Sequence, residues 1–186
     1  MVERVSALDG HAIPGRFGEA GDPGIVLSDV PGLVLHQVAA WPESLKAVGT
    51  RAAKAVGVKT APGPRMAVAG KNGALLRIEP LKWWMIGVEA PELAAEEGAT
   101  LDLSHSRTHV RIAGPQAAPL LNRHLPLDLR QAHFPVGSVA SSAFHHVGVT
   151  VWRSKDGYEL FLPRGFALSL WDLLLESAAQ FGGEIV

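Results

Sequence analysis

The chain has 186 residues, a length suited to one domain or to two small lobes that share a core. It has no cysteine, which excludes disulfides, thiol catalysis and cysteine-bound zinc. Lysine and arginine number 17 and aspartate and glutamate 18, so the basic excess typical of nucleic-acid-binding proteins is missing. We therefore expect no nucleic-acid partner.

Hydropathy argues against a membrane protein. No segment reaches the roughly 20 apolar residues that a membrane-spanning helix needs. The N-terminal stretch "MVERVSALDGHAIPGRFGEAGDPG" lacks the apolar run of a secretory signal, so we expect a cytoplasmic location. Only 19% of residues are charged, against about 25% in typical soluble domains. A low charge content indicates a large core or a surface covered by a partner.

The first residues and the remainder of the chain differ in pattern. Residues 1–24 are rich in glycine, proline and alanine and show no sustained period, which predicts an extended N-terminal arm. Residues 25–186 predict a single α+β domain of two lobes, about 25–99 and 100–186. The arm is expected to lie outside the core.

The first lobe shows three apolar, β-branched segments and two helical periodicities. Strands are expected at residues 33–40, 74–79 and 82–88. A helix should follow Pro42 and end at Gly57, which suits a C-terminal cap. A short second helix is expected from Pro91 to Gly98, with acidic residues in its first turn.

The second lobe begins with a clean alternation of polar and apolar residues. Strands are expected at residues 107–112, 138–145, 147–153 and 158–162. Helices are expected from Gln116 and over residues 166–181, and Asp156-Gly157 predicts a hairpin turn. Strands and helices do not alternate strictly. The order therefore predicts an α+β fold of two mainly antiparallel sheets with helices packed against them.

The stretch "LDLSHSRTHVRIAGP" carries two histidines, His105 and His109, with Arg107 and Arg111 interleaved. On a strand, residues four apart share a face but lie about 13 Å apart. Two such histidines cannot both reach one metal ion at about 2 Å. We interpret these four residues as a polar, partly cationic strand face. Such a face suits an acidic partner surface or the carboxylates of a folate.

Two pairs of adjacent residues are further candidates. Neighbours on a strand point to opposite sides, so Trp83-Trp84 should place one ring in a core and one outward. An outward tryptophan is typical of an interface, although a core site covered by a loop stays open. His145-His146 should divide in the same way. The eight histidines leave a generic metal-binding module as another hypothesis, but no metal ligand is predicted.

Familiar catalytic signatures are missing from the sequence. It contains no Gly-x-Ser-x-Gly, no Gly-x-Gly-x-x-Gly and no Walker-type phosphate loop. The residues alone therefore predict neither a nucleophile elbow nor a dinucleotide site.

Three long segments resemble the gamma subunits of heterotetrameric sarcosine oxidases. They are "LDLSHSRTHVRIAGPQAAPLLNRHLPLDLR", "FPVGSVASSAFHHVGVTVWR" and "YELFLPRGFALSLWDLLLESAAQFG", with weaker similarity in "IEPLKWWMIG" and "VPGLVLHQVAAWP". Together they cover most of residues 30–182. That family is similar to the folate-binding region of aminomethyltransferases, through the frame D-L-S-H, G-P-x-A-A-x-L-L-N and D-L.

The resemblance also shows a difference. In the aminomethyltransferases, a strand after a glycine pair carries an acidic residue that serves folate chemistry. The matching "HHVGVTVWR" holds Val149, Thr150 and Val151, with no carboxylate. An apolar side chain cannot replace a positioned acid in proton handling. The resemblance thus implies a chain without catalytic, cofactor-binding or metal-binding residues of its own.

The family implies the wider function. The complex would oxidatively demethylate sarcosine to glycine, forming hydrogen peroxide and, with tetrahydrofolate, methylenetetrahydrofolate. FAD, FMN, NAD, tetrahydrofolate and zinc would lie on the partners, the alpha, beta and delta subunits. The alternative is a stand-alone tetrahydrofolate-binding one-carbon protein, whose pocket would use polar groups such as Arg107, His109 and Tyr158.

Overall fold

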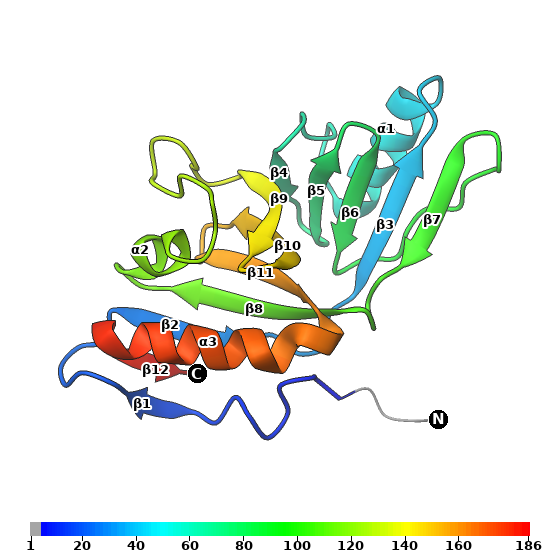
Figure 1. Ribbon diagram of the computed structural model, residues 1–186. Coiled ribbons are helices and arrows are strands. Elements are labelled where there is room, and N and C mark those ends of the chain that lie inside the picture. Colours follow the sequence, from blue (N-terminus) through cyan, green and yellow to red (C-terminus); the bar gives the residue numbers. More distant parts are fainter. Residues whose placement is uncertain (1–4) are drawn as a thin grey trace. The chain divides into compact units, whose positions relative to one another are not determined.

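The computed structural model describes residues 5–186, which form two compact units (Figure 1). The first unit contains residues 5–32, 106–136 and 141–186. The second contains residues 33–105 and 137–140. This division differs from lobes at 25–99 and 100–186, because residues up to 32 join the C-terminal half of the chain.

The first unit is built on a seven-stranded sheet. In spatial order its strands are β1 (Gly15–Phe17), β12 (Gly183–Ile185), β2 (Ile25–Asp29), β8 (Arg107–Ala113), β11 (Tyr158–Pro163), β10 (Val147–Arg153) and β9 (Val139–Phe144). β12 and β2 run parallel, while β1–β12, β2–β8, β8–β11 and β11–β10 are antiparallel. The central strands β8 and β11 therefore have partners on both sides.

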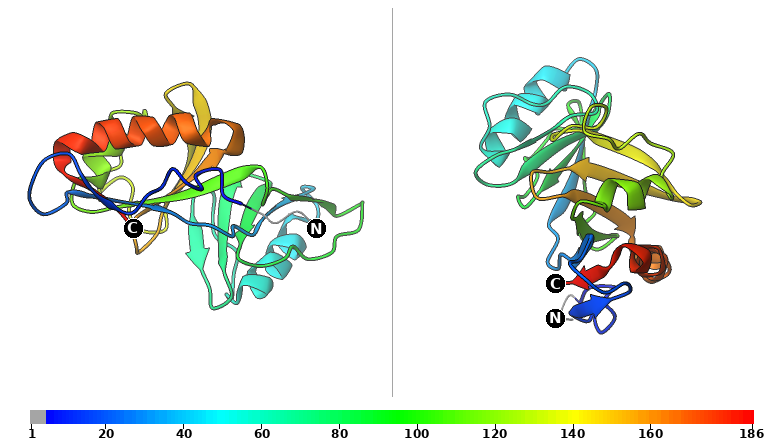
Figure 2. Two further views of the ribbon diagram at one scale, coloured as in Figure 1. Left: turned by 90° about the horizontal axis from the view of Figure 1, so that it is seen from below. Right: turned by 90° about the vertical axis from the view of Figure 1, so that its left-hand side faces the viewer.

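Helices pack on this unit through apolar stripes. α2 (Ala117–Asn122) holds Pro119 within its first turn, where the missing N–H does no harm. α3 (Ala167–Ala178) lies between 3-10 turns at Arg164–Phe166 and Ala179–Phe181. Its buried residues recur every three or four positions: Ala167, Leu170, Trp171, Leu174 and Ala178. Figure 2 shows α3 running along the strands of its own unit.

The second unit is an antiparallel five-stranded sheet with one helix. Its strands, in spatial order, are β4 (Ala67–Ala69), β5 (Ala74–Glu79), β6 (Lys82–Ile86), β3 (Leu35–Ala40) and β7 (Gly98–Asp102). Helix α1 (Leu45–Val56) packs Val48, Ala52 and Val56 into the core of this unit. Gly57 ends the helix with φ 83°, where its N–H donates to the Lys54 carbonyl.

The predicted fold class is confirmed, and most strands lie where the periodicity placed them. The helix predicted from Pro91 is wrong, because residues 91–94 are irregular, residues 95–97 form a turn and Gly98 opens β7. A segment of eight residues gains little helical stability of its own. Here the Glu97 carboxylate accepts hydrogen bonds from Arg51 and from the Ala94 N–H, which fixes the turn instead.

The N-terminal arm also differs from the expectation. Its described part, residues 5–24, packs on the first unit: β1 pairs with β12, and Leu8 is fully buried. Backbone groups outside the strand are paired too, since the Glu19 N–H donates to the Ala179 carbonyl. The strand was missed because three residues are too few for an alternation to show. Among residues 5–186, no helix is long and apolar enough to cross a membrane.

Candidate functional site

The predicted polar strand face does not form as a surface. His105 is exposed in the turn before β8, and Arg107 and Arg111 are half-buried. His109 is only 7% exposed, although it alternates with apolar residues as predicted. His109 is therefore buried in the strand face rather than part of its exposed surface. His105 is exposed and the Arg111 side chain is 37% exposed, so these two remain candidate interface residues.

His109 is buried against the carboxylate of Glu159, a residue that no motif in the sequence marks as functional. Glu159 lies on β11 directly opposite Arg111 on β8, and it is 1% exposed. Its Oε2 lies 2.7 Å from His109 Nε2. Arg111 Nε donates to Oε1 at 2.8 Å, and the Ser154 hydroxyl donates to the same oxygen at 2.8 Å. Both carboxylate oxygens are thus engaged by the chain itself.

The electrostatics keep Glu159 ionised. Burial raises the pKa of Glu159, because it penalises the charged form. The hydrogen bond and electrostatic attraction of His109, with the hydrogen bonds from Ser154 and Arg111, outweigh burial and hold the pKa of Glu159 below its usual range. Since a carboxylate only accepts, His109 Nε2 carries the shared proton. The His109 ring also stacks on Phe161, with centroids 4.7 Å apart.

A signal for this cluster is present in the sequence. "YELFLP" is an apolar strand interrupted by one acid, and a lone charge in such a run is stable only when it has buried partners. The pairing of β11 with β8 supplies these partners, and that register was not derivable from the sequence.

β10, which has no acid where the aminomethyltransferases carry one, is closely packed at its middle. On β10, Val149 is 4% exposed, Thr150 5% and Val151 fully buried. The Thr150 hydroxyl lies 3.2 Å from the Ser141 hydroxyl on β9. These contacts leave the middle of β10 without a group that titrates near neutral pH.

The tryptophan pair does not place a ring in solvent. Trp83 is 1% and Trp84 4% exposed, which fits the alternative of a covered core site. Trp83 belongs to the core of the second unit with Val38 and Met85. The Trp84 indole N–H donates to the Gln37 side chain at 3.3 Å.

The histidine pair also departs from the expectation. His145 and His146 form the turn between β9 and β10, and both are exposed. His145 has φ 57°, and the two ring centroids lie 5.0 Å apart. Among the described residues, no three histidine, aspartate or glutamate side chains gather closely enough to hold a metal ion.

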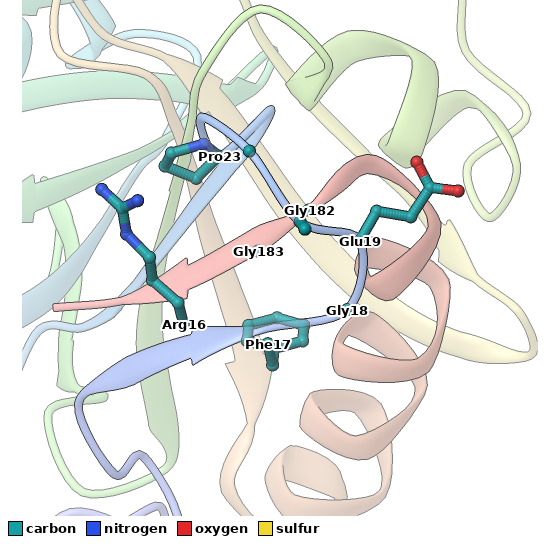
Figure 3. A pocket seen from close by; sticks show the side chains of 9 residues that line it. Arg16, Phe17, Gly18, Glu19, Pro23, Gly182 and Gly183 are labelled. Carbon is teal, nitrogen blue, oxygen red and sulfur yellow. The ribbon is translucent and has the colours of Figure 1, made fainter.

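A pocket of about 220 Å³ lies beside β1 and β12 (Figure 3). Figure 3 shows Arg16 and Glu19 at opposite ends of it, with the Phe17 ring against the strand at Gly183. Four glycines and Pro23 form much of the wall. Small-molecule pockets usually measure roughly 300–1,000 Å³ and are lined by apolar side chains with a few converging polar groups. This hollow has neither property, and none of the predicted site residues lies in it.

Comparison with known proteins assigns this chain to a family. Residues 84–186 match the GCVT N-terminal domain. The chain is 30% identical to a sarcosine oxidase subunit gamma from Corynebacterium sp. strain P-1, over 76% of this chain and 70% of that protein.

Solved structures show the same fold. A heterotetrameric sarcosine oxidase from Corynebacterium sp. U-96, in complex with pyrrole 2-carboxylate, contains a chain that superposes with a TM-score of 0.79 at 23% identity, over 96% of both chains. The glycine cleavage system aminomethyltransferase T from Bartonella henselae superposes with a TM-score of 0.57 at 19% identity, over 84% of this chain and 47% of that one. The chain therefore belongs to the family of sarcosine oxidase gamma subunits, and its residues 84–186 belong to the GCVT N-terminal domain family.

Proposed function

We propose that this chain is the non-catalytic gamma subunit of a heterotetrameric sarcosine oxidase, which oxidatively demethylates sarcosine to glycine. The observation that carries the proposal is the state of Glu159. The acid buried in the sheet of the first unit has both oxygens bound by His109, Arg111 and Ser154. We interpret Glu159 as a carboxylate that stabilises the fold, and β10 contains no carboxylate.

A general acid or base must reach the proton that it transfers and must have a pKa near the working pH. Glu159 meets neither condition, because it is 1% exposed and its pKa lies below the usual range. We infer that this chain supports the assembly instead. The family membership and the low charge content agree with that role.

The remaining parts of the proposal concern the partners. The alpha, beta and delta subunits would bind this chain and carry FAD, FMN, NAD, tetrahydrofolate and zinc, in the cytoplasm. With tetrahydrofolate present, the complex would release methylenetetrahydrofolate together with hydrogen peroxide.

The experiment is coexpression of this chain with its three partner subunits, followed by size-exclusion chromatography and measurement of sarcosine-dependent oxygen consumption. We expect one peak that contains four chains, oxidase activity in that peak, and neither flavin absorbance nor activity in the chain purified alone. Failure of the chain to co-elute with any partner would contradict the proposal.

The match to the GCVT N-terminal domain favours one alternative, a stand-alone tetrahydrofolate-binding protein. The polar groups expected to line its pocket do not fit this role. His109 is held by Glu159, and the Tyr158 hydroxyl donates to the Leu129 carbonyl at 2.8 Å. Calorimetry of the isolated chain with tetrahydrofolate decides between the two, since micromolar binding would favour the alternative.

A further inference from the structure

We propose that the free edge of β7, with the acidic segment that leads into it, is the docking surface for an extended basic segment of a partner subunit. This inference rests on the proposed function, because it assigns one contact of the assembled complex. It concerns only the second unit, residues 33–105 and 137–140.

The backbone of β7 (Gly98–Asp102) has an open side. β7 is the last strand of its sheet and pairs only with β3. The Trp41 N–H donates to the Glu97 carbonyl, and the Leu103 N–H donates to the Leu35 carbonyl. The backbone N–H and C=O groups of the odd-numbered residues along β7 therefore point toward β3. In an antiparallel pair these bonds alternate. The backbone groups of Thr100 and Asp102 therefore point outward, where an added strand would pair.

Asp102 is the one charged residue of this edge, which otherwise lacks the protection that edge strands usually have. Residues 99–102 are all exposed, and Leu101 is 55% exposed. The strand "GATLD" contains no lysine and no proline, and five residues make it longer than β4, the three-residue edge on the other side of the same sheet. Natural proteins shorten, charge or cover such edges unless they are used for pairing.

An exposed aromatic ring lies next to the edge. Trp41 follows β3, pairs with the residue before β7 through its N–H, and is 48% exposed. Its indole N–H donates to the Ala95 carbonyl at 2.8 Å, which fixes the ring over the turn. A half-exposed, immobilised tryptophan is a suitable anchor for a partner.

Charge decides the kind of partner. Between Lys82 and Arg107 the chain has no lysine or arginine but five acids: Glu89, Glu92, Glu96, Glu97 and Asp102. Glu89 is paired with His36 and Glu97 with Arg51, while Glu92 and Glu96 are exposed. A strand that carries lysine or arginine would neutralise this segment. A second copy of this chain would instead bring two acidic segments together, which is repulsive.

The test uses the coexpressed complex. Hydrogen exchange of the peptide that covers residues 98–103 is compared between the isolated chain and the complex, where we expect the amides of Thr100 and Asp102 to become protected. In parallel, Thr100→Pro removes the outward N–H without touching the bonds to β3, and proline is tolerated at edge strands with that orientation. Thr100→Val keeps the N–H and is the matched control. We expect Thr100→Pro to weaken assembly by about tenfold.

A second variant tests the charge and does not alter the backbone. Glu92→Lys with Glu96→Lys should weaken assembly at low salt. Asp172→Lys with Glu176→Lys, an exposed pair on α3, changes charge equally and should assemble like the wild type.

Each outcome bears on the inference. Equal assembly of the Thr100→Pro and wild-type chains, with no protection of residues 98–103, overturns the docking surface and leaves the proposed function intact. Concentration-dependent protection in the isolated chain assigns the edge to a second copy and overturns the partner assignment. No assembly by the wild-type chain overturns the proposed function, and the inference with it.

Discussion

Glu159 and Arg111 stand directly opposite each other on β11 and β8, joined by a 2.8 Å hydrogen bond from Arg111 Nε. This pair, completed by His109 and Ser154, turns the one acid of an apolar strand into a connection between two central strands of the sheet. A cross-strand pair of opposite charges stabilises a sheet, and burial makes the loss of either partner costly.

Truncation of Glu159 should therefore cost more than its neutralisation. Glu159→Ala leaves Arg111 and His109 without their acceptor, and we expect a loss of roughly 3–5 kcal/mol in the free energy of unfolding. Glu159→Gln keeps the shape and should lose about 1–3 kcal/mol. Urea unfolding monitored by circular dichroism measures both. Equal stability of Glu159→Ala and wild type would contradict the structural role.

Acid stability should depend on the same group. The pKa of folded Glu159 lies below that of the unfolded chain, so the unfolded chain binds more protons as the pH falls. The contribution of Glu159 is present above about pH 4.3, the ordinary glutamate value, and is lost as the pH falls through the folded pKa. Between pH 7 and lower pH, the free energy of unfolding should decrease less steeply in Glu159→Gln than in wild type. An identical pH dependence of stability in the two proteins would show that Glu159 does not contribute to acid unfolding.

The sequence predicts local elements well and side-chain partners poorly. The alternation in Arg107–Ile112 correctly predicts β8, and the spacing of Leu45, Val48 and Val56 correctly predicts α1. Whether His109 faces solvent or a carboxylate depends on which strand lies beside it. Glu159 is 50 residues away in the chain, so only the sheet order could reveal the pair.

Two short strands were not predicted for a related reason. β1 and β12 have three residues each, and their pairing Arg16↔Glu184 joins the two ends of the chain. Such strands are stabilised by their neighbours rather than by their own pattern. For Trp83-Trp84, alternation correctly separates the two rings, but the pattern does not say that both sides of β6 are covered.

The packing of Phe17 on Gly183 gives a test of the N-terminal arm. A Cβ at Gly183 would lie 2.1 Å from the Phe17 ring, so Gly183→Ala should displace the ring and cost about 1–3 kcal/mol. Gly148→Ala on β10 is the control, because nothing lies within 4 Å of its added Cβ. Thermal unfolding of both variants measures the difference. An equally stable Gly183→Ala chain would mean that the Phe17 ring does not pack against Gly183 in solution.

Substitution of Trp83 and of Trp41 should distinguish a core position from a surface position. Trp83→Ala empties a core site of the second unit and should cost about 3–5 kcal/mol. Trp41→Ala removes a half-exposed ring and its hydrogen bond to Ala95, so the cost should be about 1 kcal/mol. Chemical unfolding of the isolated chain compares them. A Trp83→Ala chain that unfolds like wild type but fails to assemble would restore the interface interpretation.

The most direct test of a structural rather than chemical role is the turnover rate of the assembled complex that carries Glu159→Gln. After isolation by size-exclusion chromatography, sarcosine oxidation and methylenetetrahydrofolate formation are measured per assembled complex. The account predicts rates within about twofold of wild type, since a difference below 1 kcal/mol in the barrier is expected from a remote group. A loss of about a hundredfold or more in fully assembled complex would show that this chain takes part in the chemistry.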